Sequence, residues 1–214
     1  MGAPARLISE IEQEARQTER WTGRAAFSPR VLRAMREVRR DAFVPAARRA
    51  EAYANHPLAI GHGQTISQPY IVALMTDLLE PEPEHLVLEI GTGSGYQAAV
   101  LAMLVRQVYS IEVIPTLSAV AKAALAQEKV ANVCLKVGDG ALGWPEHAPY
   151  DGIIVTAAAR AVPEALLAQL RPGGRMVIPL GAPGGSQMLT VVRKDAAGAA
   201  TLTEILPVAF VPFV

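Results

Sequence analysis

A strand, a glycine-rich turn and a helix follow one another directly in the middle of the chain. Residues 86–90 form a short apolar run typical of a strand, Gly91-Thr92-Gly93-Ser94-Gly95 follows at once, and residues 96–104 have helical character. Glycine allows positive φ angles and lets a ligand approach the backbone closely. In doubly wound sheets such a turn lies at the carboxyl end of the first strand, where nucleotides bind. The segment therefore predicts a nucleotide-binding α/β fold.

The remaining apolar runs support a doubly wound, mostly parallel sheet. Strand-like runs alternate with helical stretches as far as residue 180, which is the pattern of parallel strands joined by helices. These runs are residues 108–113, 133–137, 152–156 and 176–180. Two further runs, 188–193 and 202–210, have no helix between them, so we expect an antiparallel pair that finishes the sheet. We expect a single domain over residues 1–214, with the α/β core and C-terminal strands in 81–214.

Residues 1–80 are expected to contain N-terminal helices and a long loop. A first helix is predicted by helical spacing of the apolar residues Leu7, Ile8, Ile11 and Ala15. Ser28 as N-cap and Pro29 at the first position predict a second helix, with an apolar face made by Val31, Leu32, Met35 and Val38. Residues 43–69 hold too many prolines and glycines for a long element, so they predict a functional loop before a helix over 70–79.

Charge and composition exclude several classes of function. The 20 Lys and Arg residues equal the 20 Asp and Glu residues, and no basic run stands out, which argues against nucleic acid as a partner. The N-terminal residues lack an apolar leader and the chain lacks a long apolar span, so we expect a cytoplasmic protein without a membrane anchor. The default expectation for the oligomeric state, which the sequence leaves open, is a monomer.

Cysteine, histidine and tryptophan show no pattern of a metal or disulfide site. Cys134 is the single cysteine, so no internal disulfide forms, and we expect it to be a small buried side chain in a strand. His56, His62 and His85 share no ligand spacing with one another or with Cys134, so we expect no metal. Trp21 and Trp144 are expected to be packing residues.

The spacing of the glycine turn distinguishes between cofactors. A dinucleotide fingerprint G-x-G-x-x-G would require glycine at position 96, where Tyr96 stands, and the third glycine comes one residue early at Gly95. Glu89 precedes the turn, where its carboxylate would repel a pyrophosphate but suits a cationic ligand. S-adenosyl-L-methionine is cationic at its sulfonium and ammonium groups. The turn therefore favours S-adenosyl-L-methionine over NAD, with Glu89, Gly91, Gly93 and Gly95 as cofactor-binding candidates.

Acidic residues at the ends of the next two strands are further candidates for binding this cofactor. Glu112 ends the second strand about 20 residues after the turn, where nucleotide folds place the acid that accepts from both ribose hydroxyls. Asp139 lies between Gly138 and Gly140 after the third strand and could accept from an adenine amino group. Thr156, after the fourth strand, is followed by three alanines rather than the Asn or Asp, prolines and aromatic residue of amine-methylating enzymes. Methylation of adenine or glutamine nitrogen is therefore disfavoured.

The loop before the helix at 70–79 carries a specific resemblance. Ile60-Gly61-His62-Gly63-Gln64-Thr65-Ile66-Ser67-Gln68-Pro69-Tyr70 resembles the signature loop of the protein-L-isoaspartate O-methyltransferases. The resemblance extends over essentially residue 28 to the C-terminus, through 43–45, 88–97, 137–140, 150–158 and 208–212. It implies a class I, Rossmann-like methyltransferase that moves a methyl group from S-adenosyl-L-methionine to the free α-carboxylate of isoaspartyl residues. The substrates would be damaged proteins and peptides, whose ester then collapses to a succinimide and is partly repaired to aspartate.

The resemblance also implies roles for individual residues. Ser67 would be the active-site serine, while Thr65 and Ile66 would line the junction of substrate and cofactor. Gly140 and Thr156 would contact the cofactor, and Ile66 with the segment 208–212, including Val208 and Val211, would hold the peptide. Ala209 and Phe213 stand where the family often has Arg and Leu, and the sequence ends at Val214 without the usual further residues. The sequence leaves open how these departures change the grip on substrate at this end.

The chemistry of the expected substrate requires mainly that the enzyme position the carboxylate against the methyl group. A free α-carboxylate has a pKa of about 3.5 and is already a nucleophile at neutral pH, so no general base is needed. The Ser67 hydroxyl could donate to one carboxylate oxygen, beside backbone N–H groups at the start of the helix at residue 70. Ser67 could instead, or in addition, be that helix's N-cap.

Three other functions remain as alternatives. A related methyltransferase of a small-molecule carboxylate or hydroxyl would share the cofactor residues without needing the 64–67 loop. A non-catalytic S-adenosylmethionine-binding regulator would be expected to have lost Ser67, and an NAD-dependent oxidoreductase is disfavoured by Glu89 and Tyr96.

Overall fold

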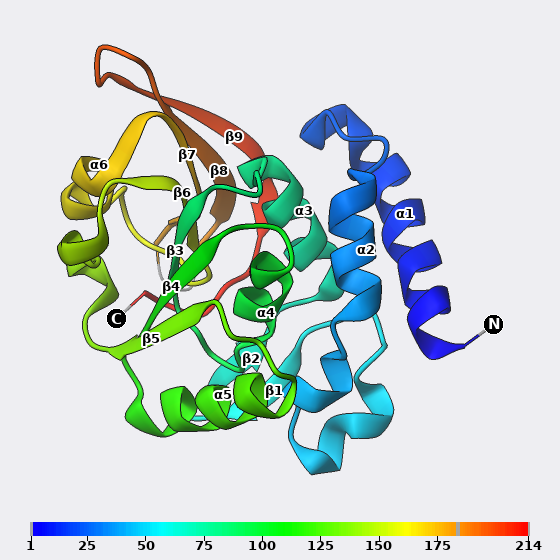
Figure 1. The fold of residues 1–214 in the computed structure, drawn as a ribbon. Helices are drawn as coiled ribbons and strands as arrows, with labels where there is room; N and C mark the ends of the chain where they lie inside the picture. Colours follow the sequence, from blue (N-terminus) through cyan, green and yellow to red (C-terminus); the bar gives the residue numbers. More distant parts are fainter. Residues whose placement is uncertain (1, 183–184, 214) are drawn as a thin grey trace.

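A seven-stranded sheet forms the centre of the computed structural model, which describes residues 2–182 and 185–213 (Figure 1). The strands lie in the order β5-β4-β3-β6-β7-β8-β9. They are β3 (Leu86–Ile90), β4 (Gln107–Glu112), β5 (Val133–Val137), β6 (Tyr150–Val155), β7 (Leu170–Gly181), β8 (Gln187–Lys194) and β9 (Ala200–Val208). Strands β5, β4, β3, β6 and β7 are parallel, whereas β8 and β9 are added antiparallel. The predicted parallel sheet with an antiparallel C-terminal pair is confirmed.

Helices cover both faces of this sheet, so its central strands are buried on each side. The helices are α1 (Ala3–Thr22), α2 (Pro29–Glu37), α3 (Pro69–Leu79), α4 (Tyr96–Ala102), α5 (Pro115–Gln127) and α6 (Glu164–Gln169), with short 3-10 helices η1 (Arg40–Phe43), η2 (Ala46–Glu51), η3 (Gly140–Leu142) and η4 (Pro145–His147). Val87 belongs to the core shared with α1 to α4, and its neighbour Leu88 to the core shared with α6. Figure 1 shows α6 on one side of the sheet and α3 and α4 on the other. No helix in the described ranges is long and apolar enough to cross a membrane.

The N-terminal helices form as the apolar spacing predicts, and the loop after them is more regular than predicted. The apolar face of α1 is buried, and the Ser28 hydroxyl accepts from the N–H of Val31 at 3.3 Å to cap α2. Within residues 43–69, however, β1 (Leu58–Gly61) and β2 (Gln64–Ile66) form an antiparallel hairpin. His62 and Gly63 both have positive φ, 52° and 71°, which is the backbone of a tight two-residue hairpin turn.

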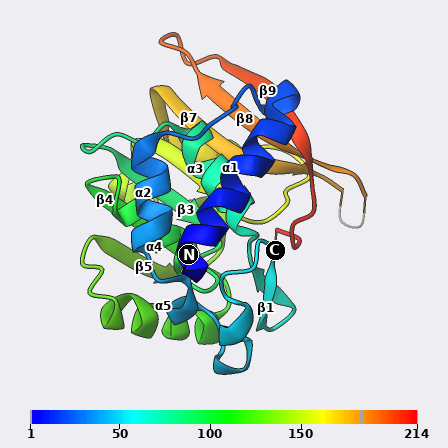
Figure 2. The same ribbon diagram turned by 90° about the vertical axis from the view of Figure 1, so that its right-hand side faces the viewer.

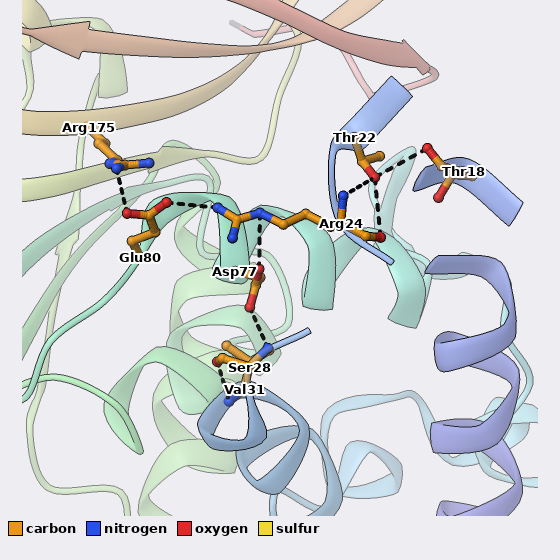
Figure 3. Close-up of polar contacts among 8 residues, drawn as sticks. All are labelled: Thr18, Thr22, Arg24, Ser28, Val31, Asp77, Glu80 and Arg175. Carbon is orange, nitrogen blue, oxygen red and sulfur yellow. Dashed lines mark hydrogen bonds and ion pairs between the residues drawn. The ribbon is translucent and has the colours of Figure 1, made fainter. Parts of the chain in front are cut away.

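A network of charged side chains ties the N-terminal helices to α3 and the sheet (Figure 3). The buried Asp77 accepts from the N–H of Ser28 at 2.7 Å and pairs with Arg24 at 3.4 Å. Arg24 also pairs with Glu80 at 2.8 Å, and Glu80 pairs with Arg175 of β7 at 2.5 Å. The end of α1 is thereby held beside α3, and Figure 2 shows α1 running across the molecule in front of α3 toward β9.

The expectation of a buried cysteine is wrong. Cys134 lies in β5 as predicted but is exposed. The reason is topological, because β5 is an edge strand of the sheet and its apolar residues are only partly covered.

Candidate active site

The glycine turn after β3 forms one wall of a cavity with about 790 Å³ of free space. Gly91 and Gly93 line it with φ angles of 89° and 54°, as predicted for this turn. A Cβ at Gly91 would lie 2.4 Å from the Thr156 hydroxyl, which donates to the Gly91 carbonyl at 2.7 Å. The other predicted residues that line the cavity are Thr65, Ile66, Ser67, Glu112, Gly140, Thr156 and Val211. The ends of β3, β4 and β6 and the β1–β2 hairpin thus meet at one place.

Glu112 links the end of β4 to the glycine turn. One carboxylate oxygen accepts from the N–H of Gly93 at 2.7 Å, and the other accepts from the N–H of Ile114 at 3.0 Å. The side chain is 5% exposed and lines the cavity. Each carboxylate oxygen has further lone pairs, so Glu112 keeps acceptors for a pair of ligand hydroxyls.

Glu89 lies behind the turn rather than on the cavity wall. It is fully buried, Ser110 donates to one of its oxygens, and its other oxygen has no partner. Ser110 also contacts Thr92 of the turn at 2.6 Å. Burial raises the pKa of Glu89 to about 8, partly offset by the Ser110 hydrogen bond. Glu89 thus supports the turn from within the protein and is largely protonated at neutral pH.

This burial predicts a pH dependence of stability. Below pH 4.5, the ordinary pKa of the carboxyl, Glu89 is protonated in both folded and unfolded states. Between pH 4.5 and about 8 only the unfolded state loses the proton, so the free energy of unfolding should fall as pH rises, by about 1.4 kcal/mol per unit at most. Glu89→Gln should remove this contribution in urea unfolding of the apo protein. Glu164→Gln, at an exposed position, should retain it, and an unchanged slope in Glu89→Gln would contradict the assignment.

Two further predicted cofactor residues do not line the cavity. Gly95, with φ of 88°, begins α4, and a Cβ there would lie 3.2 Å from that of Ala121 in α5, so its visible role is close helix packing. Asp139 is exposed and accepts from the N–H of Ala141 at 2.8 Å, which caps η3. Its neighbour Gly140 does line the cavity.

Histidines and carboxylates do not gather into a metal-binding arrangement within residues 2–182 and 185–213. His62, at the hairpin turn, instead contacts the hydroxyl of Thr116 at 2.9 Å.

Ser67 lies between β2 and α3 with a hydroxyl that makes no hydrogen bond to the described residues. The N-cap position of α3 is occupied by Gln68, and no side chain caps that helix, so the alternative role of Ser67 as the N-cap is wrong. The N–H of Tyr70 is taken by the Asn55 side chain at 3.0 Å, and Pro69 has no N–H. The first turn of α3 therefore offers fewer free N–H groups to an anion than the sequence predicts.

A second, more open cleft meets the first cavity at Ser67. It has about 1410 Å³ of free space, and Thr65, Ser67, Thr156 and Val211 line both. Helix α1, the end of β9 and the segment after β9 line it, with Val208 at the end of β9 and Ala209 directly after it. A ligand in this cleft and a ligand against the glycine turn would therefore meet beside Ser67.

Comparison with known proteins identifies the family. A model of the protein-L-isoaspartate(D-aspartate) O-methyltransferases matches residues 13–214. The chain belongs to this family. The family predicted from the 60–70 loop is confirmed, and so is its class of reaction, methyl transfer by a carboxyl methyltransferase.

Relatives carry the same family name, and solved structures share the fold. A protein-L-isoaspartate O-methyltransferase 2 of Syntrophobacter fumaroxidans is 57% identical over 98% of this chain and 85% of its own length. One from a Polaromonas species is 54% identical over 96% and 98%. A solved protein-L-isoaspartate O-methyltransferase superposes with a TM-score of 0.85 at 26% identity, over 98% of this chain and 65% of that one. A putative Plasmodium falciparum member, in complex with S-adenosyl-L-homocysteine, superposes with a TM-score of 0.78 at 21% identity over 96% and 97%.

Ala209 and Phe213, the positions expected from the sequence to depart from the family pattern, lie on the cavity walls. The C-terminal segment returns to the residues that follow β6, where Val211 accepts from the N–H of Ala158 at 2.8 Å and Phe213 donates to the Ala158 carbonyl at 3.0 Å. Phe213 lines the first cavity, and a Cβ on Gly140 would lie 3.1 Å from its ring. Ala209 lines the second cleft. Val214 lies outside the described residues.

Sequence reasoning missed the side of α1 that faces the second cleft. Glu14, Thr18 and Trp21 line it, and Thr18 contacts the Tyr70 hydroxyl at 2.6 Å. Trp21 is 49% exposed, so the expectation that it is a packing residue is wrong. The spacing 14, 18 and 21 is itself helical and lies next to the buried apolar face, which is the signal that could have identified this surface.

Proposed function

We propose that this chain is an S-adenosyl-L-methionine-dependent methyltransferase of the α-carboxylate of L-isoaspartyl residues in damaged proteins and peptides. Ser67 is its catalytic residue in this proposal. The first cavity holds the cofactor and the second cleft holds the peptide. The supporting observation is that Ser67, whose hydroxyl makes no hydrogen bond to the described residues, lines both.

The residues of the first cavity fit the cofactor. Gly91 and Gly93 leave room for a ligand beside the backbone, and Glu112 presents acceptors suited to the two ribose hydroxyls. The related Plasmodium protein holds S-adenosyl-L-homocysteine, the demethylated form of the cofactor. When bound, the cofactor supplies an activated methyl group on sulfur.

The chain's own contribution to the reaction is placement. The substrate carboxylate is ionised at neutral pH, so no side chain has to remove a proton from it. The Ser67 hydroxyl donates to one carboxylate oxygen and leaves the other free to attack in line. Walls formed by Ile66, Val211 and Phe213 exclude water from the reacting atoms.

Glu112→Ala tests the cofactor site. Loss of charge-assisted hydrogen bonds to the ribose should weaken cofactor binding by about 1.5 to 3 kcal/mol, measured by calorimetry with S-adenosyl-L-homocysteine. Unchanged affinity would contradict the ribose assignment. The same titration of Asp139→Ala tests the predicted adenine contact. This contact has less support than the ribose contact, because the Asp139 side chain already caps η3.

Methyl transfer to paired peptides separates this function from the alternative of a small-molecule carboxylate substrate. An isoaspartyl peptide should accept a radiolabelled methyl group, whereas the same peptide with normal aspartate should not. A small-molecule methyltransferase would label neither. The second cleft, lined by α1 and the C-terminal segment, has about 1410 Å³ of free space, and this size supports a peptide as substrate.

Domain organisation, oligomeric state and cellular location are part of the same proposal. We infer a single methyltransferase domain that acts as a monomer in the cytoplasm, without a nucleic-acid partner. The balanced charge and single cysteine of the sequence support this inference. Sedimentation of the purified protein tests the monomer.

A further inference from the structure

Arg40 is a fully buried arginine that reaches the backbone of the Ser67 loop. Its side chain is 0% exposed, its Nη2 donates to the Ser67 carbonyl at 2.9 Å, and its Nε donates to the Ala52 carbonyl at 2.9 Å. The guanidinium carbon lies 4.9 Å from the centre of the Tyr96 ring, which lines the first cavity. Arg40 therefore lies directly behind the point where cavity and cleft meet.

The positive charge of Arg40 is not balanced inside the protein. No ion pair of the described residues includes it, and its Nη1 has no hydrogen-bond partner. Burial lowers the pKa of Arg40 to about 10, which still leaves the guanidinium charged at neutral pH. Buried charges are usually paired, since an unpaired one is costly. Two carbonyl contacts and the adjoining Tyr96 explain how the side chain is held. None of them supplies a negative charge, because burial raises the pKa of Tyr96 to about 12 and its hydroxyl is neutral at pH 7.

We propose that Arg40 is a positioning residue whose unpaired buried charge favours an anionic group beside Ser67. The inference rests on the proposed function, because the anion is the substrate α-carboxylate. The hydrogen bond from Arg40 fixes the Ser67 carbonyl and polarises the peptide unit that leads to Gln68. The charge itself acts across a protein interior that screens it far less than water does. The carboxylate thus supplies the counter-charge that the folded chain lacks.

Ligand pairs that differ in one charge test this role. One peptide carries the isoaspartyl α-carboxylate, and the other carries a neutral carboxamide in its place. Calorimetry in the presence of S-adenosyl-L-homocysteine gives the ratio of their dissociation constants. In Arg40→Met and Arg40→Gln we expect this preference for the carboxylate to fall by roughly tenfold or more, with the affinity for the carboxamide peptide and for the cofactor nearly unchanged. Arg40→Lys should retain most of the preference at pH 7.

Arg30, whose side chain is 40% exposed and pairs with Glu82 at 3.1 Å, offers a control for the loss of an arginine held by backbone carbonyls. It too donates to two backbone carbonyls, those of Pro81 at 3.0 Å and Leu104 at 2.9 Å, but it does not contact the Ser67 loop. Arg30→Met should lower stability without changing the carboxylate preference. A purely structural role for Arg40 predicts the same result for Arg40→Met as for Arg30→Met, and that result would overturn the proposal.

Arg40→Lys keeps the test decisive if Arg40→Met and Arg40→Gln both fail to fold. A buried lysine loses its proton more readily than arginine. The carboxylate preference of Arg40→Lys should therefore decline between pH 7 and about pH 9, a range below the pKa of about 10 of Arg40, while that of the parental protein stays nearly constant. Parallel profiles would overturn the proposal. Methyl transfer by the parental protein is the separate test of function. If it labels isoaspartyl peptide while the Arg40 variants keep the full carboxylate preference, only the role of Arg40 is lost.

Discussion

Gly93→Val should abolish cofactor binding while the apo protein remains folded. The backbone of Gly93 has a φ of 54°, where a β-branched residue is strained. Its N–H holds Glu112 at 2.7 Å, so relief of that strain would also displace the predicted ribose ligand. A Cβ would lie 3.5 Å from Ile60 Cδ1, which is ordinary contact, so the valine methyl groups occupy cavity space rather than the core. We expect affinity for S-adenosyl-L-homocysteine to fall ~100-fold or more in calorimetry, about 3 kcal/mol.

Gly198→Val separates local strain from loss of the site. Gly198 has a φ of 88° and open space around its Cβ position, between β8 and β9 and remote from both cavities. This variant should lose a similar amount of stability and bind the cofactor normally. Normal binding by Gly93→Val would mean that the turn is not the cofactor cradle.

The parts of the fold that sequence predicted are those set by local pattern. Strand β3, the glycine turn and the start of α4 follow from residues adjacent in the chain, and the positive φ angles at Gly91 and Gly93 follow from the residue type. The Ser28 cap with Pro29 likewise marks the start of α2 from two residues.

Packing between residues far apart in the chain determines the features that the sequence did not predict. The burial of Glu89 and its unpartnered oxygen depend on β4 lying beside β3, so a position read as ligand-facing is in fact interior. Exposure of Cys134 depends on β5 being the sheet edge, and the cleft surface of α1 depends on the return of the C-terminal segment. Arg40 shows the same limit, because a solvated arginine and one buried behind Ser67 look alike in sequence.

Ser67→Ala should lower turnover of isoaspartyl peptide roughly 10- to 150-fold, because a hydrogen bond to a charged group contributes about 1.5 to 3 kcal/mol. Its melting temperature and cofactor affinity should be nearly unchanged. The hydroxyl makes no hydrogen bond to the described residues, and Arg40 holds Ser67 through its carbonyl, which alanine retains. Steady-state kinetics with one peptide, together with thermal unfolding, measures both effects.

Ser28→Ala is a control with the opposite expected effects on stability and turnover. The Ser28 hydroxyl does cap a helix, accepting from Val31, so its loss should cost about 0.5 to 2 kcal/mol of stability and leave turnover unchanged. If Ser67 holds the carboxylate mainly in the transition state, Ser67→Ala lowers kcat and kcat/KM together, whereas uniform binding of the peptide would raise KM alone. Either pattern keeps Ser67 in contact with substrate. A Ser67→Ala protein that melted like Ser28→Ala and kept the parental rate would instead show that Ser67 serves stability. The carboxylate would then need another donor, and the N–H of Ile71, in the first turn of α3 and on the cleft wall, is one candidate.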